Sequence, residues 1–283
     1  MKISYNFALT WTNYKTDIMT NLKPAFLAPL LTSLFILFFS LNTQAETNRG
    51  YKGTWNDIKS DYSEFYSTDT FIRMGIVFTG GAIMANTNID QDFQDRNKGN
   101  IYSVNDSLNI KKLGEGKYLI PLSLISASIG HYLSDGKELS GIGKWGELTA
   151  RAYLVGGPTV LATQLLTGAS RPSEAPYTSD WKPFNDSNGV SGHSFIGAVP
   201  FLTVAAMNDN LAVKTVAYLG STLAGLSRIN DNQHYLSQVI LGWYLAWESV
   251  NSVDMVETNK KNNIRVMPVV SQDRYGLQLS MKW

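Results

Sequence analysis

Three short segments in the second half of the chain hold residue types that suit phosphoryl transfer. A transferring phosphoryl group spreads negative charge over three equatorial oxygens, and an always-charged arginine can bind two such oxygens at once. A serine hydroxyl and a glycine N–H at a helix start donate without bulk, while one histidine can attack phosphorus and another can protonate the leaving oxygen. The residues that combine these abilities are Arg171, Ser191, Gly192, His193, Arg228 and His234.

The composition narrows the chemistry that these residues can serve. The chain has 283 residues, of which 44% are hydrophobic and 17% charged, and this suits one globular domain with a sizeable core. A net charge of +1 implies no large basic surface for nucleic acid. Because there is no cysteine, a disulfide scaffold and a thiolate metal site are excluded, and a three-histidine metal site would need all three histidines of the chain. We therefore expect no metal, no other cofactor and no nucleic-acid partner.

The first 45 residues have the pattern of a signal peptide. An apolar stretch at residues 26–41 follows Lys23 and precedes small residues that suit a signal-peptidase site. The stretch is short for a membrane span, although an uncleaved anchor is the alternative, and Met19 is an alternative start to Met1. We expect the mature chain to be exported to the periplasm, with association with a membrane surface left open.

Six apolar segments of helical length follow in the mature chain. None reaches about 18 uninterrupted apolar residues, which favours a water-soluble helical bundle over a six-span membrane protein. The predicted helices cover residues 70–85, 118–133, 144–167, 194–206, 211–226 and 233–253. Residues 46–69 are predicted to be an N-terminal arm with about one helical turn, and a short helix is predicted near residues 90–95.

The hydrophobic period changes near the C terminus. Apolar residues alternate with polar ones from Tyr275 to Trp283, which is the spacing of a β-strand, and residues 264–270 are a candidate partner strand. The predicted fold is therefore all-α, a six-helix bundle with a small C-terminal β-hairpin. The predicted division of the chain is a signal peptide at 1–45, an arm at 46–69, a helical domain at 70–254 and a hairpin at 264–283.

The order and spacing of the three segments resemble the signature of the phosphatidic-acid phosphatase type 2 (PAP2) superfamily. That superfamily includes bacterial class A acid phosphatases, lipid phosphate phosphatases and vanadium haloperoxidases. Its pattern reads K-x6-R-P, then P-S-G-H, then S-R-x5-H-x3-D, and the resemblance covers roughly residues 144–250. The resemblance implies a helical bundle of the acid phosphatase and vanadium haloperoxidase type, with the site at helix ends.

Matched by position, the resemblance also implies a role for each residue. His234 would be the nucleophile that forms a phosphohistidine, and His193 would be the general acid for the leaving group. The groups implied to bind the phosphate oxygens are Arg171, Ser191, Gly192 and Arg228. His131, the third histidine, lies outside the pattern and is expected to be a helix-end residue without a catalytic role.

Two departures from the pattern affect the phosphate cradle. The family lysine is Gln164 here, which removes one positive charge but keeps an amide donor in the predicted phosphate site. Lys182, in the loop after Arg171, is a candidate substitute for the missing charge. The family proline before Ser-Gly-His is Val190, which changes the stiffness of the loop and leaves its chemistry intact.

The third departure lies beside the predicted nucleophile. The family aspartate is Gln238 here, four residues after His234 and hence on the same helix face. A glutamine oxygen can accept the hydrogen bond that fixes the imidazole tautomer, but it brings no charge. Losing the equivalent carboxylate of a serine protease triad costs about 10⁴ in rate. Asp231 and Glu174 are candidate compensating carboxylates.

The resemblance implies a metal-independent phosphatase, a phosphoric monoester or pyrophosphate hydrolase, that acts on phosphate esters through a phosphohistidine. Its substrates would be phosphorylated lipids, or small organic phosphates, with peripheral contact with a membrane left open. One alternative is a catalytically impaired relative that keeps the bundle for binding or assembly in the cell envelope. Another is a vanadium-dependent haloperoxidase, which is disfavoured because Gln164 and Gln238 replace the lysine and aspartate that hold vanadate.

Overall fold

The computed structural model describes residues 49–134, 139, 141–175, 177–261, 264–271 and 274–281. The predicted signal peptide at residues 1–45 lies outside the described residues. The described helices belong to one compact unit that begins at Arg49. No helix among the described residues is long and apolar enough to cross a membrane.

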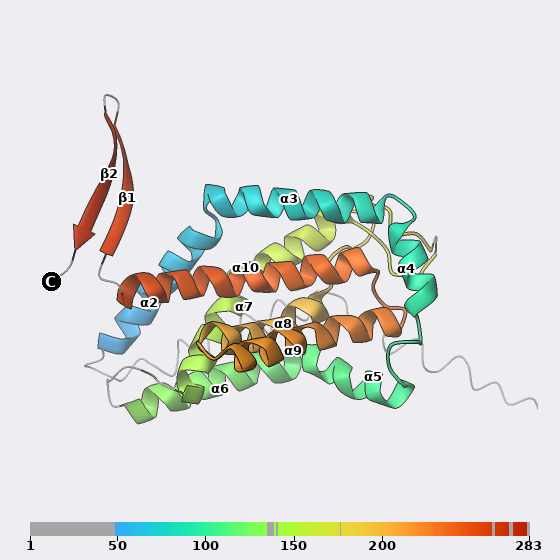
Figure 1. Cartoon of the computed structure of the whole chain (residues 1–283), viewed down its shortest axis with the longest axis horizontal. Helices are drawn as coiled ribbons and strands as arrows, with labels where there is room; N and C mark the ends of the chain where they lie inside the picture. Colours follow the sequence, from blue (N-terminus) through green and yellow to red (C-terminus); the bar gives the residue numbers. More distant parts are fainter. Residues whose placement is uncertain are drawn as a thin grey trace, which may run out of the picture. The chain divides into compact units, whose positions relative to one another are not determined.

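Nine α-helices and one short 3-10 helix make up the helical part of the described chain (Figure 1). In chain order they are α2 (Arg49–Phe65), α3 (Thr68–Ala85), α4 (Ile89–Asn97), α5 (Val104–Ile110), η2 (Lys111–Gly114), α6 (Gly116–Ser134), α7 (Gly141–Thr167), α8 (Gly192–Ala206), α9 (Leu211–Asn230) and α10 (Leu236–Lys261). The prediction of a helical fold is confirmed. The six predicted apolar helices correspond to α3, α6, α7, α8, α9 and α10, and the short predicted helix is α4.

The secondary structure predicted for residues 46–69 is wrong, because most of that segment is the helix α2. The helix is polar overall, so the apolar spacing that would announce it is weak. It is held by tertiary contacts instead: Phe65 is fully buried in the core, and the Tyr62 hydroxyl donates to the Leu154 carbonyl at 2.8 Å. The short helix α5 also lacked a sequence prediction, although Ser103 caps it by accepting from the Asp106 N–H at 3.2 Å.

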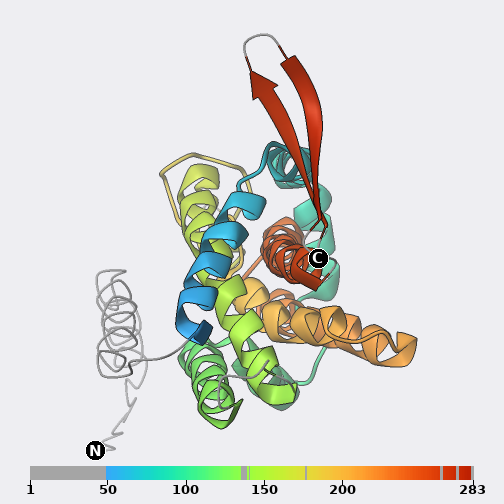
Figure 2. The ribbon, with the colours of Figure 1, turned by 90° about the vertical axis from the view of Figure 1, so that its left-hand side faces the viewer.

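The helix α10 is the central element of the bundle. It packs against α2, α3, α4, α7, α8 and α9, and Figure 2 shows it nearly end-on with other helices around it. Leu241, Leu245 and Ala246 on this helix are fully buried, as is Val199 of α8. The helix also buries polar residues, among them Gln238 and Glu248, and each of these has hydrogen-bond partners within the protein. The position of α10 matters for the site because its first turn carries Gln238 and His234 lies in the turn just before it.

A glycine sets how closely α8 approaches this central helix. A Cβ added at Gly242 of α10 would lie 2.3 Å from the carbonyl oxygen of Ser191, a distance that no real side chain tolerates. The Ser194 hydroxyl of α8 donates to the Val239 carbonyl of α10 at 2.8 Å. The start of α8 is therefore held against the first turns of α10.

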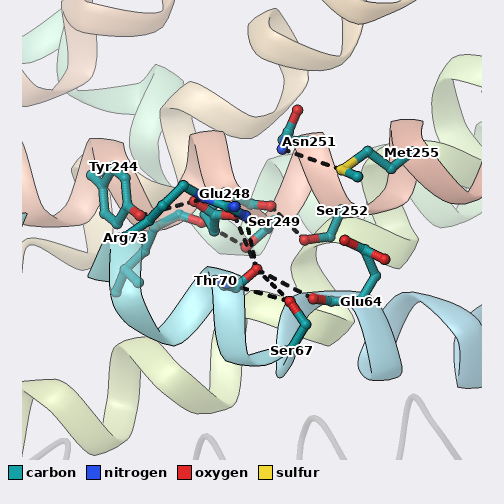
Figure 3. A network of polar contacts seen from close by, with 11 residues as sticks. Glu64, Ser67, Thr70, Arg73, Tyr244, Glu248, Ser249, Asn251, Ser252 and Met255 are labelled. Carbon is teal, nitrogen blue, oxygen red and sulfur yellow. Dashed lines mark hydrogen bonds and ion pairs between the residues drawn. The ribbon is translucent and has the colours of Figure 1, made fainter. Parts of the chain in front are cut away.

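A buried glutamate joins α3 to α10, as Figure 3 shows. Glu248 of α10 is fully buried and accepts from the Arg73 guanidinium, with Nη2 at 2.5 Å from Oε1. The Tyr244 hydroxyl and the Thr70 hydroxyl also donate to this carboxylate, at 2.9 and 3.3 Å. Ser67 caps α3 one turn earlier by accepting from the Thr70 N–H. The charge of Glu248 is thus fully partnered.

A second buried charge cluster, which we call the Arg151 cluster, joins α2, α7 and α10. Arg151 is 2% exposed and binds Asp61 through Nε and Nη2, each at 2.7 Å. Its Nη1 donates to Glu257 at 2.6 Å and to Glu147 at 3.2 Å. Asp57, Glu147 and Glu257 bring carboxylate oxygens within 4.8 Å of one another, and the cations beside them are the Arg151 guanidinium and the Lys144 ammonium.

Two β-strands follow α10 in the chain. β1 (Ile264–Ser271) and β2 (Arg274–Met281) pair antiparallel, with a register that runs from Ile264 opposite Met281 to Ser271 opposite Arg274 (Figure 1). They form a two-stranded sheet on their own. The residues between the strands, 272–273, lie outside the described residues.

Candidate active site

The second sequence segment forms the N-terminus of α8. Ser191 is the N-cap: its backbone is extended and its hydroxyl oxygen accepts from the Ser194 N–H at 3.3 Å. Gly192 and His193 follow as the first two helical residues, where backbone N–H groups have no partner within the helix. The Ser191 N–H donates to the carbonyl of Gln238 at 2.8 Å, which places this helix start beside the start of α10.

Gln164 holds the loop that leads into α8. Its Nε2 donates to the Val190 carbonyl at 2.9 Å, and the same amide nitrogen would lie 3.5 Å from a Cβ added at Gly192. Gln164, which the sequence predicts to bind phosphate, therefore lies at the edge of the N-terminus of α8. One of its two N–H groups positions the loop that carries the Ser-Gly-His segment.

A tight turn between α9 and α10 brings the third segment together. Arg228 is in the last turn of α9, and its carbonyl accepts from the backbone N–H groups of Gln233 and His234 at 2.9 and 3.2 Å. Asn232 takes a left-handed conformation (φ 58°) that lets the chain reverse, and asparagine adopts this region more readily than most residues. The five residues between the arginine and the histidine thus form a loop that closes on itself.

The tautomer of His234 follows from the partners of Gln238. His234 Nδ1 lies 2.8 Å from Gln238 Oε1, which also accepts from the Tyr235 N–H at 3.2 Å. The Gln238 Nε2 donates to the Ser170 carbonyl at 2.9 Å. Exchanging the oxygen and nitrogen of this amide would place its N–H against the Tyr235 N–H and its oxygen against the Ser170 carbonyl, so the orientation is fixed. Nδ1 of His234 must therefore carry the proton, and Nε2 keeps its lone pair.

Arg171 reaches across to the same turn from the loop after α7. Its Nε donates to Asn188 Oδ1 at 2.9 Å and its Nη1 donates to Gln233 Oε1 at 3.3 Å. The side chain is 39% exposed, and Glu174 lies 3.9 Å from its Nε. The guanidinium is thus positioned mainly by two neutral amides, which leave its charge available to an anion.

The pKa values show that the two histidines and the two arginines share one electrostatic environment. Burial lowers the pKa of His234 to about 3; its bond to Gln238 opposes this, and the charges of Arg171, His193 and Arg228 add to it. Burial also lowers the pKa of His193 to about 4, with further lowering by Arg228, Lys111 and Arg171. Both imidazoles are therefore neutral at pH 7. The predicted site residues are brought together by the hydrogen bonds between Ser191 and Gln238, between His234 and Gln238 and between Arg171 and Gln233.

Arg228 is the buried cation of this site. It is 5% exposed, and its Nη2 pairs with Asp231. Its Nε is buried and has no hydrogen-bond partner among the described residues. Burial lowers the pKa of this guanidinium, the charge of Arg171 lowers it further, and Asp231 opposes both. A buried donor without a partner costs about 1–3 kcal/mol, and an oxyanion bound here would complete it.

The two candidate carboxylates bond to the arginines of the site and, among the described residues, not to His234. Asp231 binds Arg228 and accepts from the Ser107 hydroxyl at 2.5 Å, while Glu174 accepts from the backbone of Arg171 and from Asn188. Among the contacts of the described residues, neither carboxylate bonds to His234. Lys182 is exposed, with its backbone N–H bonded to the Thr167 carbonyl.

The sequence did not identify the residues of α4 that hold the α9–α10 turn. Gln94, 1% exposed, donates to the Ile229 carbonyl at 2.9 Å and to Asn232 Oδ1 at 3.0 Å. Asp90, fully buried, accepts from the backbone and the hydroxyl of Ser237 at 2.9 and 2.5 Å, so it caps the first turn of α10. Polar residues in a polar stretch give no signal of burial, which is why the pattern missed them.

The segment between α4 and α5 adds to this support. Asn230 Oδ1 accepts from the N–H groups of Ile101 and Tyr102 at 3.0 and 2.9 Å, and the Asn230 carbonyl accepts from Gly99 at 2.9 Å. The turn that carries Arg228 and His234 is therefore fixed by a segment more than a hundred residues earlier in the chain. His131, by contrast, lies in the last turn of α6, with Nε2 3.3 Å from Glu147 of the Arg151 cluster.

Comparison with known proteins agrees with this arrangement. The family model described as the PAP2 superfamily matches residues 154–255. This stretch contains every predicted site residue. Neither a curated protein nor a solved structure matches the chain. A match to this superfamily suggests a phosphatase-type activity and phosphorylated substrates in general. With its arginines and histidines gathered between the start of α8 and the start of α10, the chain carries a PAP2 superfamily domain at residues 154–255.

Proposed function

We propose that the protein is a metal-independent phosphatase that hydrolyses phosphate esters through a phosphohistidine on His234. The observation that carries this proposal is the state of the His234 imidazole. Its Nδ1–H is held by Gln238, its Nε2 lone pair is free, and burial keeps it neutral beside two guanidinium groups. A neutral, oriented imidazole next to paired cations is the arrangement that attack on a phosphate needs.

The first half of the reaction transfers the phosphoryl group to the enzyme. Arg171, Arg228 and the N–H groups at the start of α8 bind the equatorial oxygens, and the unpartnered Nε of Arg228 gains an acceptor. His234 Nε2 forms a bond to phosphorus while the bond from phosphorus to the leaving oxygen breaks. A proton passes from the His193 imidazolium to the leaving oxygen.

The second half returns the enzyme to its starting state. His193, now neutral, takes a proton from a water molecule as that water attacks phosphorus. The bond between phosphorus and His234 Nε2 breaks, and inorganic phosphate takes the proton back from His193 as it leaves, so that both imidazoles end neutral. In both halves the Gln238 oxygen accepts from Nδ1–H. It stabilises the positive ring through a dipole, where the family carboxylate would use a full charge, so we expect a slower reaction.

The proton on His193 must come with the substrate at neutral pH. The pKa of His193 is about 4, well below the second pKa of a phosphate monoester, which is about 6. A bound phosphate adds negative charge beside the imidazole and raises its affinity for a proton. The monoanion of the substrate therefore delivers both the phosphoryl group and the proton, which favours activity at acid pH.

Lipid-linked phosphates are the substrate class that we propose, with the protein in the periplasm and in contact with a membrane surface. The helices α3 and α6 expose several large apolar side chains, more than the scattered single residues of an ordinary water-facing surface. The most exposed of these are Ile72, Ile76, Tyr132 and Leu133. The apolar stretch at residues 26–41 supports the same location.

The decisive experiment combines an assay with a chemical trap. The purified protein is given phosphatidate in vesicles and, separately, p-nitrophenyl phosphate, beside a His234→Ala variant. We expect phosphate release that the variant lacks, and a phosphorylated protein that is labile in acid and stable in base, as a phosphoramidate is. Release that survives in His234→Ala, or an adduct on another residue, would contradict the mechanism.

A catalytically impaired relative is the second candidate, and it rests on Gln164 and Gln238. The lysine and the aspartate of the family pattern are replaced by these neutral glutamines. Both glutamine amides make hydrogen bonds within the protein. Such a protein would bind phosphate without turning it over. Phosphate binding by calorimetry together with no release from either substrate would favour this function over the first.

A further inference from the structure

One fully buried carboxylate beside the candidate active site has no basic partner among the described residues. It belongs to Asp90 of α4, which precedes the matched PAP2 stretch, so the family pattern assigns it no role. The other two fully buried carboxylates of the described chain, those of Asp61 and Glu248, each pair with an arginine. A buried charge without a cation is costly, so another feature must accommodate the charge of Asp90.

Asp90 supplies the N-terminal cap that α10 lacks in its own sequence. Tyr235 precedes the first helical residue, Leu236, and tyrosine is not among the residues that cap a helix start. The two oxygens of Asp90 accept instead from the Ser237 N–H at 2.9 Å and from the Ser237 hydroxyl at 2.5 Å. Because a donor faces each oxygen, the contacts suit an ionised carboxylate. The start of α10 therefore receives a full negative charge from another helix.

The same turn of α10 holds the nucleophile of the proposed reaction. Ser237, which Asp90 binds, directly precedes Gln238, whose Oε1 lies 2.8 Å from His234 Nδ1. His234 itself lies just before the helix, at the positive end of the α10 dipole. That end disfavours the positive charge that the ring gains when Nε2 bonds to phosphorus. A negative charge on the first N–H groups of α10 opposes this effect.

The carboxylates that the sequence suggested as substitutes for the family aspartate are committed to the arginines. Asp231 pairs with Arg228, and Glu174 accepts from the backbone N–H of Arg171. Asp90 is bonded to Ser237 of α10 and has no arginine to neutralise among the described residues. Its charge is therefore available to the turn that carries His234.

We propose that Asp90 is a positioning residue whose charge, acting through the first turn of α10, stabilises the positive His234 ring in place of the family aspartate. The inference rests on the proposed function and goes beyond it. Asp90 binds the helix start and not the substrate, so its charge should act on the phosphohistidine and leave the binding of phosphate unchanged. It acts across the helix start and not by direct contact with the ring, and so it compensates for Gln238 only in part.

The test separates the charge of Asp90 from its hydrogen bonds. Asp90→Asn keeps an acceptor for the Ser237 N–H and removes the charge, whereas Ser237→Ala keeps the charge and removes the hydroxyl bond. Kinetics of the full chain are measured with p-nitrophenyl phosphate at about pH 6. We expect Asp90→Asn to lower kcat about 10-fold with KM unchanged, within the range for a partly buried charge at a helix end. Ser237→Ala should lower the stability and keep kcat.

Denaturant unfolding gives the readout that a purely structural role would change. Removing a buried charge that has no cation should leave the free energy of unfolding of Asp90→Asn the same or higher. Asp95→Asn, an exposed carboxylate of the same helix paired with Lys98, is the control and should alter neither kcat nor stability. The proposal would be overturned by an unchanged kcat in Asp90→Asn, by an equal loss in Ser237→Ala, or by an Asp90→Asn protein that does not fold.

A protein inactive with every substrate would sink the proposed function, and anion binding then decides the role of Asp90 separately. Vanadate can bond to a histidine nitrogen in the place of phosphorus, whereas sulfate binds only through charges and hydrogen bonds. Calorimetry with each anion is carried out on the full chain and on Asp90→Asn. We expect the variant to bind vanadate about 10-fold more weakly and sulfate with the same affinity. Equal changes for the two anions, or none, would refute the inference.

Discussion

Two regions of this molecule bury an arginine, and they treat its charge in opposite ways. At the Arg151 cluster all three guanidinium nitrogens have carboxylate partners, and the pKa of Arg151 is raised although burial opposes it. At the active site, Nε of Arg228 has no partner among the described residues, and the pKa of Arg228 is lowered. The guanidinium thus has a partner for every nitrogen in the Arg151 cluster, whereas at the active site one buried nitrogen lacks a partner among the described residues.

The difference separates residues that hold the fold from residues that bind a ligand. A buried charge whose hydrogen bonds are all made helps to hold the fold. Removing one partner of such an ion pair destabilises the protein, because the other charge is left buried without compensation. A buried donor without a partner destabilises the protein alone but becomes favourable when an anion completes it. We therefore expect changes in the Arg151 cluster to affect stability, and changes around Arg228 to affect activity.

The largest effect should come from Arg151→Met. The change leaves Asp61, which is fully buried, without its cation, and breaking one partner of a buried ion pair costs about 3–5 kcal/mol. Denaturant unfolding should show this loss in the free energy of unfolding. Thr203→Ala, which removes a buried hydroxyl bonded only within α8, is the control and should cost far less. A variant as stable as the parent would show that the cluster does not hold α2 to α7.

Arg228→Lys should show the opposite behaviour. Lysine keeps the positive charge near Asp231 but cannot offer two parallel N–H groups to a phosphate. Loss of one transition-state donor of this kind costs about 10²–10³ in kcat. The free energy of unfolding should stay the same or rise, because the unpartnered Nε is removed. A variant that is unstable but fully active would reverse the assignment of the two regions.

Gln238→Leu tests the positioning of His234. Leucine has a similar volume but cannot hold Nδ1–H, so the imidazole loses its fixed tautomer. Changes in residues that orient a reacting group typically cost about 10- to 100-fold, and we expect this loss in kcat with little change in KM. Asn251→Leu, an amide further along α10 whose Nδ2 donates to Met255, is the matched control. An unchanged kcat would mean that the ring is held by packing alone.

Changing the pH tests the burial of His234 without a mutation. In the folded protein the pKa of His234 is about 3, against about 6.5 in an unfolded chain, so the unfolded state binds more protons between these values. Stability from this group is complete above pH 6.5 and is lost as the pH falls toward 3. Thermal unfolding from pH 3 to 7 measures it, and His234→Ala should flatten the curve.

The pH profile of activity gives a separate measurement. We expect kcat/KM to fall below about pH 3, where His234 is protonated, and above about pH 6, where the substrate monoanion is lost. A profile that rises from pH 6 to 8 would contradict the transfer of a substrate proton through His193.

The sequence predicts the candidate catalytic residues of this protein better than the residues that hold them in position. The helices α3 and α6 to α10 follow from runs of apolar residues, and the site residues follow from type and spacing, since only a few side chains can bind and transfer a phosphate. The helix α2, the helix α5 and the burial of the polar residues of α4 could not be found in this way. Asp90 and Gln94 are polar residues in a polar stretch, and nothing local distinguishes a buried glutamine from an exposed one.

By itself, the sequence determined which groups are present, namely two arginines and two histidines in a family order, with glutamines at 164 and 238. Only the tertiary structure decided their state. Burial lowers the pKa values of His193 and His234, Gln238 fixes the tautomer, and the packing around Arg228 leaves its Nε without a partner. The physical reason is that desolvation and hydrogen-bond partners depend on residues brought together from α4, α7, α8 and α10, whereas local spacing reports only the residue types.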